Sequence, residues 1–158
     1  MTKEHILGKV GSGGTDIVEL TVTMTSNTTP SGYRAYSYAE TTGYEAYRAF
    51  DGTDRWVTYF ASSTGSGNYL AYQFPSAVTV KQMVVLIRNS NTYDIEACNN
   101  GNWSDAVKLG TLTPTSSSSD QLKIIPLDND TAYTDYRLKW VSGNNSIGIY
   151  KVYMQGIK

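Results

Sequence analysis

Short runs of alternating apolar and polar residues, separated by polar turns, make up most of this chain, and no segment keeps the 3.6-residue apolar period of an amphipathic helix. In the segment 17–24, Val18, Leu20 and Val22 alternate with polar neighbours, which is the two-residue period of a half-buried strand. The same reasoning predicts strands at 17–24, 69–74, 78–87, 93–98, 106–113, 121–127, 133–141 and 147–157. One short helical turn is expected at 44–50. The sequence therefore predicts an all-β fold, a sandwich or jelly roll.

The division of the chain follows from its glycine and serine content. Four small residues at 11–14 end a flexible lead, so we expect two parts: an N-terminal lead and docking strand at 1–24 and one jelly-roll domain at 25–158. The serine run 116–119 is expected to be a solvated loop. A chain of 158 residues can bury a core without disulfides or a structural metal.

Charge and residue content exclude several classes of protein. Thirteen Lys and Arg against 14 Asp and Glu give a formal net charge of -1, which argues against a nucleic-acid partner. No apolar run approaches the roughly 18 residues of a membrane span. The single cysteine, Cys98, cannot form an internal disulfide and is expected to be a small buried apolar residue.

Catalysis has no support in the sequence. The only histidine, His5, lies in the flexible lead, so a Ser-His-Asp or Cys-His arrangement has no general base, and zinc lacks ligands. Carboxylates are present, but their spacing fixes no pair across a cleft as a glycosidase requires. The chain is therefore expected not to be an enzyme.

Aromatic residues indicate a binding surface instead. Thirteen tyrosines are present, and the segments 33–40, 88–92 and 144–145 together supply aromatic rings, Arg, Asn and Glu. An aromatic face stacks on the apolar side of a sugar ring, while planar amide, guanidinium and carboxylate groups bind its hydroxyls. Loops at one end of a jelly roll converge, so these segments predict a shallow polar and aromatic site there.

Five separated blocks occur in the order found in discoidin-like (coagulation factor V/VIII C-type) domains. They are the run Tyr-Glu-Ala-Tyr-Arg-Ala-Phe-Asp-Gly at 44–52, Trp56, and the segments 69–74, 78–88 and 94–103. The ordered set covers about residues 25–158 and, more narrowly, resembles family 32 carbohydrate-binding modules. The segment 24–32 looks like the entry to copies of this domain in bacteriophage and prophage tail proteins.

This resemblance implies a galactose-binding-domain-like jelly roll with no catalysis of its own and a glycan site on loops at one end. Family members use an aromatic platform with an Arg, an Asn and often a His or Glu, and this chain has no histidine for that role. The candidate ligand-binding residues are Tyr36, Tyr38, Glu40, Arg88, Asn91, Asn144 and Asn145. The lipid-binding branch of the family has a second cysteine and apolar loop tips that are missing here, so no membrane binding is expected.

A structural calcium is often held in this family by an Asp-Gly loop after the helical turn and by a carboxylate on the last strand. Asp51 and Gly52 match that loop, but the last-strand position is Lys151. Since a cation repels a metal, we expect no cofactor, and our hypothesis is that the Lys151 ammonium replaces calcium by pairing with Asp51 or Asp54. The alternative is that Lys151 points to solvent. If calcium is kept, Asp51 and Asp54 are its candidate ligands.

The expected function is a non-enzymatic module that binds host surface glycan, carried as a tail or capsid appendage of a phage virion. Single-site sugar affinity of about millimolar becomes useful only in many copies, so a multicopy assembly docked to other virion proteins through residues 1–24 is expected. If Met1 is the natural start, the chain is made in the host cytoplasm without a signal peptide. One alternative is a structural virion decoration or assembly protein that has lost sugar binding. Another is a fragment of a secreted, extracellular glycosidase or adhesin.

Overall fold

The computed structural model describes residues 16–53, 60–62, 67–143 and 147–157. Within these residues the chain forms strands joined by turns and two short 3-10 helices, η1 and η2. In chain order the elements are β1 (Val18–Glu19), β2 (Arg34–Ser37), η1 (Ala46–Ala49), β3 (Phe60–Ser62), β4 (Tyr69–Asn89), β5 (Thr92–Cys98), η2 (Trp103–Asp105), β6 (Val107–Leu112), β7 (Ser116–Pro126), β8 (Tyr133–Ser142) and β9 (Ile147–Ile157). The all-β expectation is confirmed.

Strand β4 belongs to both layers of a sandwich. Its first part pairs with β2 and β8, and β8 continues the layer through β5 to β6. Its second part pairs with β7 and β9, and β9 also pairs with β1 and β3. The bend between the two parts lies at Pro75, which is exposed, where the register with β8 shifts between Gln73 and Val78. Every pairing is antiparallel, as expected for a jelly roll.

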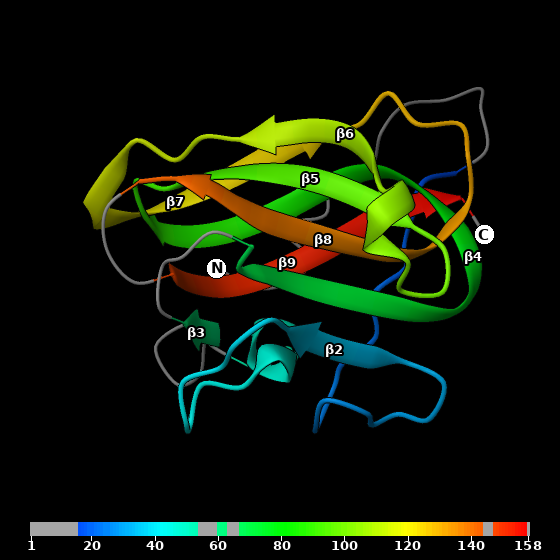
Figure 1. Cartoon of the computed structure of the whole chain (residues 1–158), viewed down its shortest axis with the longest axis horizontal. Coiled ribbons are helices and arrows are strands. Elements are labelled where there is room, and N and C mark those ends of the chain that lie inside the picture. Colours follow the sequence, from blue (N-terminus) through cyan, green and yellow to red (C-terminus); the bar gives the residue numbers. More distant parts are fainter. Residues whose placement is uncertain (1–15, 54–59, 63–66, 144–146, 158) are drawn as a thin grey trace.

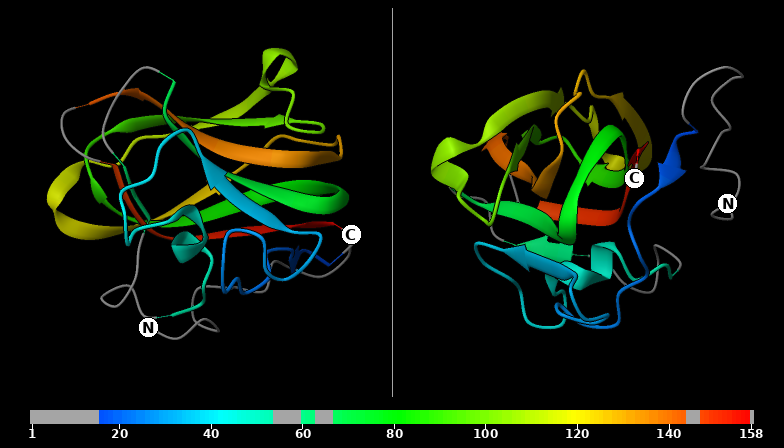
Figure 2. Two further views of the ribbon diagram at one scale, coloured as in Figure 1. Left: turned by 60° about the horizontal axis from the view of Figure 1, so that its bottom comes forward. Right: turned by 90° about the vertical axis from the view of Figure 1, so that its right-hand side faces the viewer.

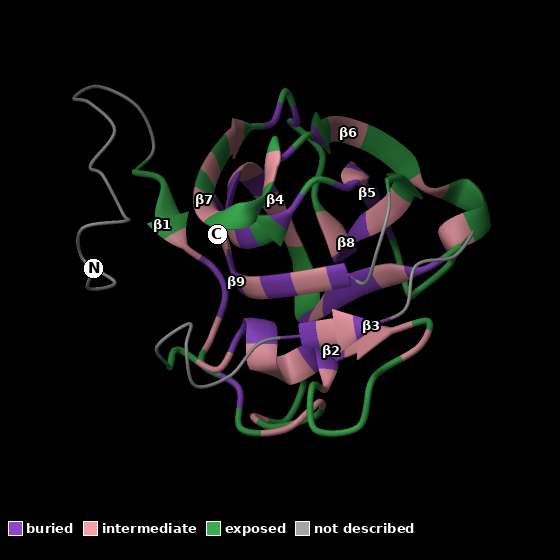
Figure 3. Ribbon diagram, turned by 90° about the vertical axis from the view of Figure 1, so that its left-hand side faces the viewer, coloured by how far each residue is buried: buried purple, intermediate pink, exposed green. Residues whose placement is uncertain are grey.

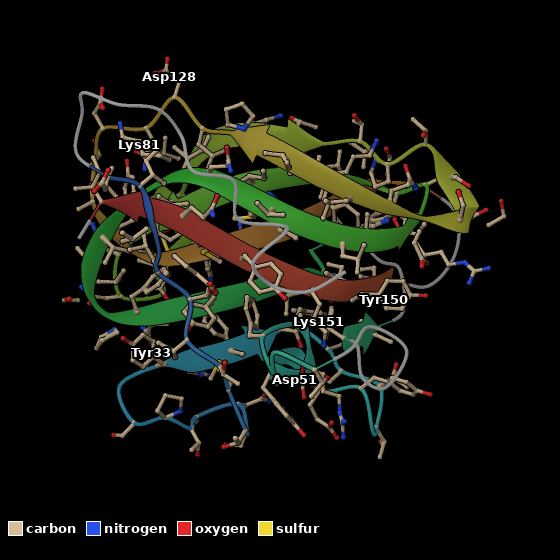
Figure 4. The ribbon with its side chains drawn as sticks, turned by 180° about the vertical axis from the view of Figure 1, so that it is seen from behind. Tyr33, Asp51, Lys81, Asp128, Tyr150 and Lys151 are labelled. Atoms are coloured by element: carbon tan, nitrogen blue, oxygen red, sulfur yellow. The ribbon has the colours of Figure 1, made fainter. Side chains whose placement is uncertain are left out.

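The two layers are visible from opposite sides of the molecule. Strands β5, β6 and β8 face the viewer in Figure 1, whereas β7, β4 and β9 face the viewer in Figure 4. Figure 2 shows β2 and η1 packed together beside the sandwich. The space between the layers is filled by large apolar and aromatic side chains, among them Tyr72, Tyr93, Tyr136, Met83 and Ile149, none more than 2% exposed. On β8, Tyr136 and Leu138 point into this core.

Three sequence-based expectations need correction. The serine run 116–119 opens β7 instead of forming a solvated loop, and Ser116 pairs with Asn89. The predicted strand 17–24 pairs with β9 only at Val18–Glu19, and Leu20 and Met24 are buried in the core. Most of this segment is therefore not paired in the sheet, although parts of it contact the core, and residues 1–15 lie outside the described part. Two short strands, β2 and β3, were not expected.

The strand directions define two ends of the molecule. At one end, which we call the loop end, lie the described residues 38–43, 67–68, 89–91 and 142–143 and the start of β9, because β4 both begins and finishes there. Figure 3 shows the molecule from this side. At the other end, which we call the opposite end, lie the β4 bend, the β5–β6 connection and the start of β8. The loop end is the end at which the sequence predicts that loops converge.

Buried tyrosines make the fold sensitive to alkaline pH. Burial raises the pKa of Tyr93 to about 12 and also raises the pKa of Tyr72 and Tyr136. The folded chain keeps these protons at a pH where the unfolded chain has lost them, so their stabilising contribution is complete below about pH 10 and is lost as pH rises toward 12. We expect the free energy of unfolding to fall by about 1.4 kcal/mol per pH unit for each such tyrosine in that range. Urea unfolding at about pH 8 and pH 11 measures this. If Tyr93→Phe left the fall unchanged, Tyr93 would not be one of these groups.

Candidate functional site

Hydrogen bonds join the segments of the loop end although they are distant in sequence. The Asn89 amide donates to the carbonyl of Gly148 at 3.0 Å, which ties the end of β4 to the start of β9. The N–H of Trp140 donates to the carbonyl of Asn68 at 2.8 Å, and the N–H of Thr41 donates to the carbonyl of Ala61 at 3.0 Å. The residues that follow β2 and those that follow β4 therefore come together at this end, which is part of the expected convergence of the segments 33–40 and 88–92. Asn144 and Asn145 lie outside the described residues.

Arg88 and Tyr38 are the two predicted residues that this end presents to solvent. Arg88 is exposed beside the end of β4, and no described residue pairs with its guanidinium group. Tyr38 follows β2 with 70% of its surface exposed. The loop that follows Tyr38 lies against β3, which is two strand spacings, about 10 Å, from β4 through β9. A planar cation and a free aromatic ring are thus offered on one end of a rigid sandwich.

Asn91 is expected from the sequence to bind ligand. The structure instead buries it fully, so it is not placed to contact a ligand. Its N–H donates to the Asn89 side chain at 3.0 Å and its amide donates to the Tyr93 hydroxyl at 3.3 Å. The backbone of Gly143 covers it, because a Cβ atom at Gly143 would lie 2.3 Å from the Asn91 Oδ1 atom. Among the described residues, none donates a hydrogen bond to that oxygen. Asn91 therefore organises the loop end from below.

Glu40 is also used within the fold. Its Oε1 atom accepts hydrogen bonds from the Asn27 amide at 3.1 Å, from the Ser37 hydroxyl at 3.3 Å and from the N–H of Ala46 at 3.1 Å. These contacts hold the 38–45 loop against the beginning of η1. Glu40 remains exposed, but its hydrogen bonds within the loop already explain the position of its carboxylate.

Tyr36 lies away from the loop end, on the outer face of the sheet. Because β2 alternates, Ala35 points inward and Tyr36 points outward, where its hydroxyl donates to the Asp135 carboxylate at 2.7 Å. Burial, followed by this hydrogen bond to an anion, raises the pKa of Tyr36. The segment 33–40, expected to be a binding loop, is therefore half strand, and Tyr36 belongs to a structural network.

That network centres on Arg137, which the sequence analysis did not single out. The Arg137 guanidinium lies 4.1 Å from the ring centroid of Trp103 and 5.1 Å from that of Tyr69, and its Nε donates to Glu96 at 2.8 Å. The side chains of Arg137 and Glu96 are only 8% and 11% exposed. Because β8 alternates, Arg137 lies on the face opposite to the buried Tyr136 and Leu138. Its pairing with Glu96 depends on the register with β5, which a single sequence does not contain.

Lys151 reaches the Asp-Gly loop after η1, as Figure 4 shows. Its Nζ donates to Asp51 Oδ1 at 2.6 Å and to the Arg48 carbonyl at 2.9 Å, and it lies 3.4 Å from the Thr53 hydroxyl. The side chains of Lys151 and Asp51 are 4% and 7% exposed. Pairing with Asp51, one of the two expected partners, is confirmed, and the solvent-facing alternative is wrong. Asp54 lies outside the described residues.

Carboxylate, carbonyl and hydroxyl oxygens are the ligands that calcium prefers, but here they surround an ammonium group. The residues present therefore do not fit the calcium site implied by the resemblance. Elsewhere in the described part of the chain, no group of three or more His, Cys, Asp or Glu side chains is arranged to hold a metal.

Two further observations limit the chemistry of the molecule. Cys98 is 2% exposed, as predicted, and burial raises the pKa of its thiol to about 11, so it carries little thiolate at neutral pH. Across the residues that the structure describes, no helix is long and apolar enough to cross a membrane.

Solved structures with the same fold include carbohydrate-binding modules and an F5/8 type C domain. The family 32 module of Clostridium perfringens NanJ, solved with galactose, aligns with a TM-score of 0.65 at 18% identity, over 78% of this chain and 93% of that one. Chitosan-binding module 1 of a Paenibacillus sp. IK-5 chitosanase/glucanase gives 0.66 at 19% identity, over 79% and 96%. An F5/8 type C domain from Bacteroides fragilis gives 0.66 at 13% identity, over 80% and 92%.

These likenesses establish the jelly-roll fold class that the sequence predicted. Sequence comparison adds nothing to them, since no protein-family model matches the chain and no curated protein matches it significantly.

Proposed function

We propose that this chain is a non-catalytic carbohydrate-binding module whose site lies at the loop end. The observation that carries the proposal is the exposed Arg88 guanidinium, which no described residue engages, on the same end as the 70% exposed ring of Tyr38. A planar fork of donors binds vicinal hydroxyls or a sugar carboxylate, and a tyrosine ring stacks on a sugar face. Structural neighbours solved with galactose and with 4,5-unsaturated mannuronic acid support the class of ligand.

The spacing of the strands at the loop end favours an extended glycan. Two strand spacings, about 10 Å, separate β4 from the strand beside the Tyr38 loop, which exceeds the width of one hexose ring. Arg88 and Tyr38 would then contact different units of one chain. Affinity for a single unit is expected to be about millimolar, so tight attachment requires several copies.

Removal of the Arg88 guanidinium is expected to abolish glycan binding without unfolding the protein. The protein, made multivalent on a scaffold, is applied to an array of bacterial surface glycans beside Arg88→Ala. Lys108→Ala is the matched control, because it removes one positive charge from an exposed side chain on β6, on the other sheet. Signals that are lost in Arg88→Ala and kept in Lys108→Ala are the expected result. Equal signals from all three proteins would contradict the assignment of the site.

The setting in which the module works is a finer proposal. A weak site that needs many copies suits a virion appendage, with residues 1–24 as its connection to other virion proteins. Mass spectrometry of purified particles from the source phage or prophage should then detect the chain. If the chain is present in particles but silent on every glycan, the structural decoration protein would be the correct function.

We also propose that the fold needs no calcium. The Lys151 ammonium already supplies a positive charge to Asp51 and to the Arg48 carbonyl at the C-terminal end of η1. Introducing a divalent cation would place two positive charges within hydrogen-bond distance of the same carboxylate, which is unfavourable at a site this buried. The melting temperature is therefore expected to be the same with a chelator and with millimolar calcium.

A further inference from the structure

A polar hollow at the opposite end has no part in the proposed function. It is an open hollow of about 460 Å³ lined by Cys98, Asn99, Asn100, Asn102, Asp105 and Tyr133. These residues come from the connection between β5 and β6 and from the start of β8, both at the opposite end. The seven residues of β5, about 20 Å of strand, separate this hollow from the loop end.

The loop that forms the hollow is held firmly by the sheet beneath it. Asn100 and Gly101 both have positive φ, 55° and 68°, and the N–H of Asn102 donates to the Asn99 carbonyl at 3.1 Å, as in a type I′ turn. The N–H of Asn100 donates to the Thr134 hydroxyl at 2.8 Å, and the N–H of Gly101 donates to the buried Asp135 at 3.1 Å. Because the turn is already ordered, a ligand would lose little free energy in ordering it.

Several polar groups of this rigid turn remain available. No described residue hydrogen-bonds the side-chain amide of Asn100 or the hydroxyl of Tyr133. One carboxylate oxygen of Asp105 accepts a hydrogen bond from the Asn102 amide at 2.6 Å, and the other oxygen remains available to a ligand. The Tyr133 ring is half-buried, with its centroid 6.1 Å from that of Tyr136. An amide, a carboxylate and an aromatic wall with a hydroxyl thus line one small hollow.

From these groups we infer a second sugar-binding site, for a neutral hexose or a hexosamine. Amide and carboxylate groups bind adjacent hydroxyls in pairs, and the Tyr133 ring offers an apolar wall. The volume is within the range of small-molecule sites and is sufficient for one monosaccharide unit. The lining contains Asp105 and no Lys or Arg, so it favours an amine-bearing unit and disfavours uronic acids. This site does not depend on the loop-end site and would give the module two points of attachment.

Backbone amide chemical shifts of the full chain test this inference, because they report each end separately. The titrants are glucosamine and galactose, with galacturonic acid as the acidic comparison. Glucosamine is expected to shift the amides of residues 98–105 and 133–134. Asn100→Gly retains the left-handed backbone that glycine tolerates, and Tyr133→Phe retains the ring while removing the hydroxyl. Each variant is expected to weaken binding about three- to tenfold, the effect of one lost hydrogen bond.

The control is Arg88→Ala, which should leave the affinity at 98–105 unchanged. Three results would overturn the inference: no shifts at 98–105 with either sugar, preferential binding of galacturonic acid, or affinities that neither variant changes. Shifts confined to residues 38–43 and 88–92 would reject this second site while supporting the loop-end site.

Discussion

Lys151→Met is expected to lower the free energy of unfolding by about 3–5 kcal/mol, because it removes the buried ammonium that donates to the Asp51 carboxylate. The change also removes the donor to the Arg48 carbonyl, so the C-terminal end of η1 loses a hydrogen bond. Methionine keeps most of the length of the lysine side chain, so the loss reports charge more than volume. Urea unfolding of the two proteins measures the difference.

The matched variant for this ion pair is Asp51→Asn, alone and combined with Lys151→Met. The double variant is expected to recover part of the loss, since the buried negative charge of Asp51 is then gone as well. A cost below about 1 kcal/mol for Lys151→Met would contradict the account of this pair. Calcium that raises the wild-type melting temperature would contradict the proposal that the ammonium replaces a metal.

Arg137→Met is expected to cost a similar amount, about 3–5 kcal/mol, for a different reason. Here the cation lies over the Trp103 and Tyr69 rings and neutralises Glu96, so its loss leaves a carboxylate that is 11% exposed without its main partner. Helix η2 should also be held less firmly, because its first residue, Trp103, packs on the Arg137 guanidinium. Trp fluorescence together with urea unfolding detects both changes.

The control for this prediction is Lys139→Met. Lys139 Nζ also contacts Glu96, at 3.3 Å, but its side chain is 37% exposed. Exposed pairs contribute little, so this variant should cost less than about 1 kcal/mol. Equal losses from the two variants would show that the aromatic enclosure of Arg137 adds nothing.

Much of the fold could be predicted because burial imposes a two-residue period on the strands. The long strands of both layers were recognised in this way, and β9 has the bounds predicted for it. Strand β2 was not predicted, because only Ala35 of its four residues is buried and the pattern is too short to detect. The continuity of β4 through Pro75 was also missed, since proline usually interrupts a ladder. Here Pro75 lies in an exposed bend, at which β4 passes from one layer of the sandwich to the other.

The candidate site was less predictable, because sequence gives residue type but not direction or burial. Arg88 and Tyr38 lie exposed as a site requires, whereas Asn91 is covered by Gly143 and Tyr36 faces Asp135, 99 residues away. Glu40 is held by Asn27 and the N–H of Ala46, contacts that only the folded loop creates. The Lys151–Asp51 pair could be anticipated because the resemblance placed a cation opposite a carboxylate.

The central claim is that the loop end binds glycan. It is tested most directly by following the assigned backbone amide chemical shifts while the folded chain is titrated with oligosaccharides from a bacterial surface polysaccharide. The account predicts saturable shifts in residues 38–43 and 88–92 that disappear in Arg88→Ala. A folded protein whose loop-end amides do not respond to any oligosaccharide at millimolar concentration would contradict it.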